Sequence, residues 1–258
     1  MTTLATQSGQ MTMRHLRSFS RQPWWMAISL AQPVIWLVLF GQLFKRVVEL
    51  PGFAASSYIT FLTPAIVVMT ALFSGAWAGM GIIQDLDRGV VDRFLITPVR
   101  RGALIIGRLL QGGAISVVQS LIIIGLGLAL GARFGNGPAG LAVLIVDAAL
   151  LGAALGSLSI ALALVMRREE SLIGAVQFLA LPLQFLSTAF MAQALIPGWI
   201  RTASRYNPVN WALESARAAL VSNPDWGFVL SHAAYLLAFT VVCAWLSVRA
   251  FRSYQRSI

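Results

Sequence analysis

The sequence has very little charge. Only 11% of its 258 residues are Asp, Glu, Lys or Arg, and its mean hydropathy is +0.78. A soluble domain of this size carries about a quarter charged residues. A chain this poor in charge cannot cover its surface with polar groups, so we predict a membrane protein and exclude a water-soluble fold.

Lysine is almost missing, since Lys45 is the only one and arginine carries nearly all of the net charge of +10. The arginines stand in short clusters between apolar runs. That distribution fits membrane topology better than a nucleic-acid-binding face. We therefore expect membrane lipids around the chain and no nucleic-acid partner.

Residues that bind metals or form disulfides are equally scarce. Cys243 is the single cysteine, and His15 and His232 are the only histidines, so neither a disulfide within the chain nor a metal site is expected. The nucleotide-phosphate pattern GxxxxGK[ST] is missing, as are HExxH and GxSxG. The sequence thus predicts no catalytic residues, no cofactor and no ATP hydrolysis in this chain.

Long apolar runs are what the sequence does contain. A membrane-spanning helix needs about 20 apolar residues, and six runs meet that length. We therefore predict an all-α membrane protein, one transmembrane domain over residues 1–258 with both termini on the same side. The six predicted spans are Trp24–Phe44, Tyr58–Ile83, Ala103–Gly131, Ala139–Met166, Ser171–Met191 and Gly227–Ala250.

The basic residues indicate which side the termini occupy. With the termini inside, thirteen of the nineteen basic residues fall on the inner side and six on the outer side. Cytoplasmic segments carry the excess of Lys and Arg. Both termini are therefore predicted to be cytoplasmic.

The N-terminal segment, residues 1–22, is predicted to be a cytoplasmic tail with a basic amphipathic helix. Arg14, Arg17 and Arg21 share one helical face, and apolar residues share another. Such a helix lies in the membrane interface. It would anchor the chain to lipid or contact a partner, and the sequence leaves both open.

A dense charged island, Ile82 to Arg101, separates the second predicted span from the third and holds seven charged residues. One reading is a solvated loop whose arginines only fix the topology. The acids of the island count against it, because they do not contribute to topology. Helical spacing of apolar and charged positions instead indicates a short amphipathic helix that docks onto a soluble partner. Its apolar stripe is Leu86, Val90 and Phe94, and its charged residues are Asp85, Asp87, Arg88, Asp92 and Arg93.

The segment before the last span is predicted to form two short outer helices. Pro197 is placed to open the first. Asn207 is a favourable N-cap residue and Pro208 a favourable first helical residue, so they are expected to start the second. Trp199 and Trp211 make both helices amphipathic, so we expect them to lie in the outer membrane interface or to dip into the bilayer.

Pairs of glycines four residues apart occur in three predicted spans, at Gly75–Gly79, Gly127–Gly131 and Gly152–Gly156. Small residues at this spacing let helix backbones approach closely in a membrane. They indicate packing within one bundle or a contact between subunits.

Asp147 is the one acid deep inside a predicted span, which leaves no second carboxylate for an aspartate protease. An ionisable residue in lipid is costly and is a functional candidate by default. It either faces a pore or interface, or lies near the outer boundary and reaches water or an arginine. Five glutamines raise the same question more mildly and either line a polar route or bond between helices: Gln32, Gln111, Gln119, Gln177 and Gln184.

The order of these pieces resembles the ABC type-2 family of exporter permeases and looks closest to the daunorubicin-resistance-type permeases of actinobacteria. The likeness covers nearly the whole chain. It rests on Asp-Arg-Gly, Phe-Leu, Thr-Pro-Val-Arg-Arg and Gly-Arg between Asp87 and Arg108. It also rests on YNPVNWALESARAAL, which contains Glu214 and Arg217.

This resemblance implies a permease in a bacterial cell membrane that exports a hydrophobic or amphipathic compound, such as a drug, lipid or glycolipid. It implies a dimer with a second copy or a paralogue. It also implies a separate ATPase subunit that binds ATP and Mg²⁺ and docks on Leu86 to Leu95. A membrane scaffold or a bilayer-embedded transferase without an ATPase is the alternative.

The family likeness also places a substrate cavity at the dimer axis, between the second and fifth spans. An apolar cavity needs hydrophobic and aromatic walls with a few polar groups that orient the ligand. The residues expected to supply them are Phe73, Trp77, Gln177, Phe178, Gln184 and Phe185.

Overall fold

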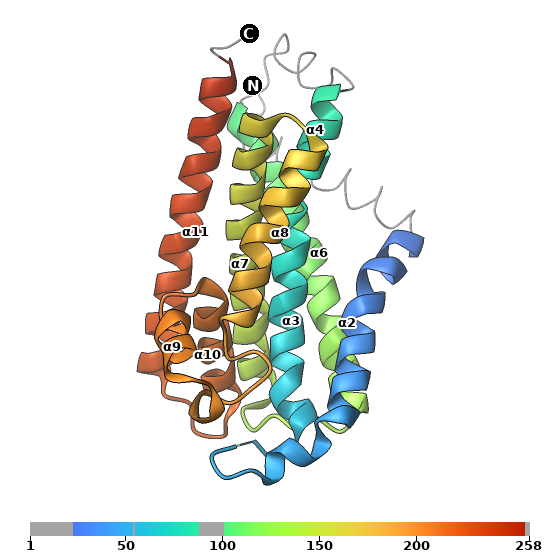
Figure 1. The fold of residues 1–258 in the computed structure, drawn as a ribbon, viewed down its shortest axis with the longest axis vertical. Coiled ribbons are helices and arrows are strands. Elements are labelled where there is room, and N and C mark those ends of the chain that lie inside the picture. The colour runs from blue at the N-terminus through green and yellow to red at the C-terminus, as the bar shows by residue number, and fades with distance from the viewer. Residues whose placement is uncertain (1–22, 54, 88–100, 256–258) are drawn as a thin grey trace.

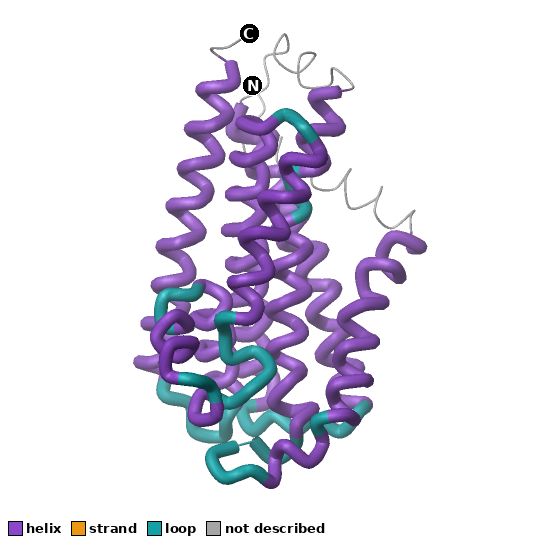
Figure 2. Tube along the Cα trace, viewed as in Figure 1, coloured by secondary structure: helices purple, strands orange, loops and turns teal. Residues whose placement is uncertain are grey.

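The computed structural model describes residues 23–53, 55–87 and 101–255. This part of the chain is helical and contains no strand (Figure 2), which confirms the all-α prediction. The long helices are α2 (Pro23–Leu43), α3 (Tyr58–Ala76), α6 (Arg101–Ala129), α7 (Gly137–Met166), α8 (Glu169–Phe185) and α11 (Trp226–Gln255). The short ones are η1 (Lys45–Glu49), α4 (Met80–Asp87), η2 (Gln193–Leu195), α9 (Gly198–Ser204) and α10 (Pro208–Leu220).

Four stretches of the described residues are long and apolar enough to cross a membrane: Tyr58–Asp87, Gly112–Ala129, Gly137–Met166 and Trp226–Tyr254. They correspond to the second, third, fourth and sixth predicted spans. The first predicted span corresponds to a shorter apolar stretch of α2, Ile28–Leu43. In the fifth, α8 ends at Phe185, before the predicted end at Met191.

The long helices run side by side, and their ends define two ends of the molecule (Figure 1). We call the end that holds Asp87 and Gln255 the α4 end. The other, the α10 end, holds α9, α10 and the connection between α2 and α3. Most of the described non-helical chain gathers at the α10 end (Figure 2), so among the described residues that end carries most of the irregular backbone that must find hydrogen-bond partners.

Helix α7 is the centre of the bundle, because it contacts α3, α4, α6, α8, α10 and α11. Its glycines allow this. A Cβ at Gly75 of α3 would overlap the carbonyl oxygen of Gly152, and one at Gly140 would meet the backbone of α10. The small residues of the second and fourth predicted spans therefore pack α3 against α7 within one chain, which is the first of the two roles predicted for them.

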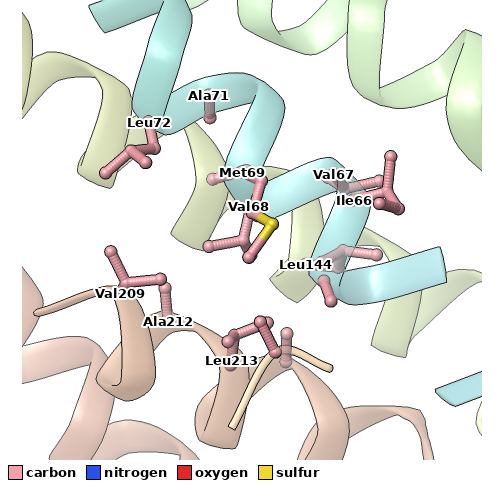
Figure 3. Close-up of a cluster of buried hydrophobic side chains, with 14 of the residues drawn as sticks. Ile66, Val67, Val68, Met69, Ala71, Leu72, Leu144, Val209, Ala212 and Leu213 are labelled. Carbon is pink, nitrogen blue, oxygen red and sulfur yellow. The ribbon is translucent and has the colours of Figure 1, made fainter. Parts of the chain in front are cut away.

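The buried core joins α3, α7 and α10 (Figure 3). Side chains of α3 such as Ile66 and Met69 lie near Leu144 of α7 and Leu213 of α10. Most side chains of α3 are buried, whereas α2 and α11 leave many large apolar side chains exposed. The apolar outer surface is the one that lipid would solvate.

Candidate functional site

The predicted docking segment lies only partly within the described residues. Asp85, Leu86 and Asp87 form the last turn of α4 at the α4 end (Figure 1). Asp85 and Leu86 are half-buried and Asp87 is exposed. The other five predicted docking residues lie outside the described residues: Arg88, Val90, Asp92, Arg93 and Phe94. The predicted helix of residues 1–22 lies outside them as well.

Two small apolar clusters fix α4 to the rest of the bundle. Ile83 is 1% exposed and packs with Ala163 of α7 and Leu172 of α8. Ile82 packs against a second cluster that includes Leu164 of α7 and Phe251 of α11. The base of the docking segment therefore contacts α7, α8 and α11. A movement of α4 would change its packing against all three helices.

A short break separates α3 from α4 at Trp77–Gly79. The Ser159 hydroxyl of α7 donates a hydrogen bond to the Ala76 carbonyl at 2.5 Å, and its oxygen accepts one from the Gly79 amide at 3.0 Å. A Cβ at Gly79 would overlap the Ser159 backbone oxygen. The glycine therefore serves close approach to α7 at the point where the helix is interrupted.

A groove of about 430 Å³ lies between α2, α3 and α6. Phe73 and Trp77, both predicted on the substrate path, line it together with Trp36 of α2. No charged side chain lies along it among the described residues. Gln119 of α6 borders it and donates a hydrogen bond to Ser29 of α2 at 3.1 Å. Its remaining lining residues include Gln32, Thr70, Ser74 and Met69.

The other four predicted path residues lie on α8 and do not line that groove. Phe178 is 78% exposed, Phe185 is 59% exposed and Gln177 is also exposed, so these three form an uncovered face. Gln184 is 1% exposed and points inward. Within one chain the structure therefore brings Phe73 and Trp77 together, but it does not join them to the α8 residues.

Sequence reasoning missed the part played by α2. Trp36 was not singled out, although it lines the groove and its ring lies 5.7 Å from that of Phe190. The available signal was the amide Gln32, four residues earlier and therefore on the same helical face. Trp36 and Gln32 together would have placed α2 beside a polar-aromatic groove.

At the α10 end, α10 supplies the hydrogen bonds that the end of α8 lacks. Asn207 caps α10 by accepting a bond from the Val209 amide at 2.9 Å, and Pro208 follows it, which confirms the predicted start of the helix. The Asn207 amide also donates to the carbonyls of Leu183 and Leu186 at 2.7 and 2.8 Å. Pro197 caps α9, as predicted.

Arg217 completes this arrangement. Its guanidinium donates to the carbonyls of Thr188, Ala189 and Phe61 at 2.7, 3.2 and 3.2 Å, and lies 3.7 Å over the Phe61 ring. Burial lowers the pKa of Arg217 to about 9, an effect that Tyr58 and then Glu214 partly offset. Arg217 therefore stays protonated at neutral pH and ties the irregular chain after α8 to α3 and α10.

Glu214 of α10 and Asp147 of α7 have different surroundings. Glu214 contacts His232 of α11, with 3.3 Å between the carboxylate oxygen and Nε2. Asp147 is 1% exposed and lies beside Ser215 of α10, although neither of its oxygens meets hydrogen-bond distance and angle with a described group. Glu214 and Arg217 also border a cavity of about 680 Å³ at the α10 end.

Comparison with known proteins gives one family. Residues 6–221 match the family described as ABC-2 type transporter. Three similar proteins carry permease names. ycf38 of Cyanophora paradoxa, named as a transport permease, is 29% identical over 209 residues, which cover 81% of this chain and 71% of that protein.

The other two relatives are named for drug resistance. The daunorubicin resistance ABC transporter permease protein DrrB1 of Streptomyces coeruleorubidus is 28% identical over 245 residues, or 93% of this chain and 84% of that protein. DrrC of Mycobacterium tuberculosis, named as a doxorubicin resistance ABC transporter permease protein, is 25% identical over 185 residues, or 71% of this chain and 66% of that protein. These relatives are named as membrane subunits of transporters and not as enzymes. Since the family match covers most of its length, this chain belongs to the ABC-2 type transporter family.

Proposed function

We propose that the chain is the transmembrane subunit of an ATP-binding-cassette exporter for a hydrophobic or amphipathic compound. The observation that carries this is the groove of about 430 Å³ with aromatic walls, amide groups and no charged lining residue among those described. It fits an apolar cargo that a few polar groups orient. The drug-resistance names of two relatives favour a drug-like compound, and a lipid or glycolipid is the other cargo of this chemistry.

The proposed topology has six spans in a bacterial cell membrane, with both termini in the cytoplasm. Helices α2 and α8 are then the first and fifth spans, beside the four longer ones. The α10 end faces outward and the α4 end faces the cytoplasm. The excess of basic residues in the segments on the side of the termini supports this orientation.

The proposed energy source is a separate ATPase that holds ATP and Mg²⁺. This chain lacks the lysine-containing loop that cradles nucleotide phosphates. The ATPase would dock on the segment that begins at Leu86, at the cytoplasmic end of α4. From there, the contacts of Ile82 and Ile83 with α7, α8 and α11 provide a route by which docking reaches the bundle.

The proposed working unit is a dimer with a second copy or a paralogue. The uncovered aromatic face of α8, Phe178 and Phe185, is then turned toward the dimer axis and lines the transport route there. In the single chain these rings are mostly uncovered, so a second permease would complete the route that one chain leaves open.

The test starts from the intact permease in native membranes. A tagged chain extracted in mild detergent should co-purify an ATP-binding-cassette ATPase, and the reconstituted complex should move daunorubicin into inside-out vesicles when ATP is added. Phe73→Ala and Trp77→Ala should change the cargo preference. Trp245→Ala, which removes an exposed ring on α11, serves as the control. Purification without any ATPase overturns the proposed function.

A further inference from the structure

The break between α3 and α4 leaves two backbone groups outside the helical hydrogen-bond pattern. The Met80 amide donates to the Trp77 carbonyl at 3.1 Å, and the Ala78 amide donates to the Gly75 carbonyl at 2.9 Å. The Ala76 carbonyl and the Gly79 amide are thus left without backbone partners of this kind. Buried backbone groups of that type are costly unless something else pairs with them.

One side chain pairs with both. The Ser159 hydroxyl donates to the Ala76 carbonyl and accepts from the Gly79 amide, and Ser159 is only 2% exposed. The two bonds lie on opposite sides of the break. Ser159 therefore holds the end of α3 and the start of α4 to the same point of α7.

The break also stands between the two functional regions of the chain. Trp77, its first residue, lines the groove between α2, α3 and α6 and packs against the cluster around Ile83. Helix α4, which follows, carries the start of the docking segment. Any change in the angle between α3 and α4 moves Trp77 relative to that segment.

We infer that Ser159 is a positioning residue for transport, which latches the α3–α4 break so that docking of the ATPase at the end of α4 is transmitted to Trp77 in the groove. This inference rests on the proposed function. A hydroxyl can serve as such a latch because each of its hydrogen bonds contributes only about 1 kcal/mol net. Gly79 is part of the device, since a Cβ there would overlap both the hydroxyl and the backbone oxygen of Ser159.

A matched control lies two residues away on the same helix. Ser157 is also fully buried, but its hydroxyl donates to the Ala153 carbonyl of its own helix at 2.7 Å. Ser157→Ala removes a buried hydroxyl without touching the break. A difference between Ser159→Ala and Ser157→Ala therefore reports the latch and not the general cost of losing a hydroxyl.

The experiment compares the two variants in the reconstituted permease–ATPase complex. Ser159→Ala should lower the ratio of daunorubicin-stimulated to basal ATPase rate by at least about fivefold, the factor that corresponds to one of the two average hydrogen bonds that it loses. Membrane levels should stay normal, and Ser157→Ala should keep the wild-type ratio. Gly79→Ala should reproduce the loss from the other side of the break. Equal ratios for the two serine variants overturn the inference.

Amide hydrogen exchange supplies a second measurement that does not need the ATPase. A peptide covering residues 76–80 should exchange faster in Ser159→Ala than in the wild type, and Ser157→Ala should not change it. An unchanged exchange rate overturns the latch even if transport falls. If the wild-type chain binds no ATPase, the proposed function fails and the exchange measurement alone decides whether Ser159 holds the break.

Discussion

At the scale of single residues, the glycines show how closely α3 and α7 approach. A Cβ at Gly75 would overlap the Gly152 carbonyl oxygen, whereas one at Gly125 of α6 would meet nothing within 4 Å. The same substitution should thus have opposite effects at the two positions.

Gly75→Ala should destabilise the protein by about 1–3 kcal/mol, the usual cost of overpacking. Gly125→Ala should be neutral or stabilise it, because alanine is favoured over glycine inside a helix by about 1 kcal/mol. Thermal unfolding of the two purified variants in the same detergent checks this. A Gly75→Ala protein as stable as Gly125→Ala would contradict the close contact.

Asn207 combines two tasks that a single atom change can separate. Its side-chain oxygen caps α10, and its amide group donates to the carbonyls of Leu183 and Leu186. Asn207→Asp keeps the capping oxygen but loses both donors. We expect it to destabilise the protein by roughly 2 kcal/mol or more, because unsatisfied buried carbonyls cost about 1–3 kcal/mol.

The control for this change is Asn223→Asp, since Asn223 is exposed at the same end of the molecule. It adds the same charge without removing a buried donor and should leave the unfolding temperature close to that of the wild type. Asn207→Asp with wild-type stability would show that the carbonyls at the end of α8 do not need these bonds.

At the scale of elements, the position of α9 and α10 provides a test of the orientation in the membrane. If the α10 end is outside, a cysteine there should react with an impermeant thiol reagent in intact cells. Ser204 is a poor position because it is fully buried, whereas Thr202 of the same helix is exposed. Thr202→Cys in a Cys243→Ala background should be labelled without opening the membrane.

Ser171→Cys provides the opposite arm of that test. Ser171 is exposed in the first turns of α8, near the α4 end, and should be labelled only after the membrane is opened. Labelling of Ser171→Cys in intact cells, with Thr202→Cys protected, would reverse the proposed topology.

At the scale of the whole molecule, the docking segment should matter for coupling and not for folding. Asp92→Ala and Arg93→Ala lie on the predicted charged face, where surface substitutions change stability by less than about 0.5 kcal/mol. The double variant should reach the membrane at normal levels and lose cargo-stimulated ATPase activity. Full stimulation in the double variant would leave the docking segment without a role.

The exposed face of α8 allows a second test of the assembly. Phe178 and Phe185 are mostly uncovered in the single chain, so alanine at either position should cost the fold little. If a second permease completes a transport route there, these variants should change which compounds are exported more than how much protein is made. An unchanged export profile across several dyes and drugs would place this face against lipid.

The sequence by itself determined the class of the protein and most of its helices. Low charge and apolar runs of about 20 residues indicated an all-α membrane protein, because a helix satisfies its backbone groups within the same segment while it crosses the lipid. Local chemistry was also informative at Asn207-Pro208, since Asn is favoured at the N-cap and Pro at the first helical position. The residues between Asp87 and Arg108, together with the YNP segment, pointed to the family that the comparison then confirmed.

Only the tertiary structure decided which residues meet. Two of the six predicted path residues gather with Trp36 and Gln119 in a groove between α2, α3 and α6, and the others lie on or inside α8. Helical periodicity names the faces of a helix but not the neighbour that each face finds. The same holds for Ser159, an ordinary small residue in sequence. Its hydroxyl matters because α7 passes the α3–α4 break within hydrogen-bond distance, a distance fixed by the packing of the whole bundle.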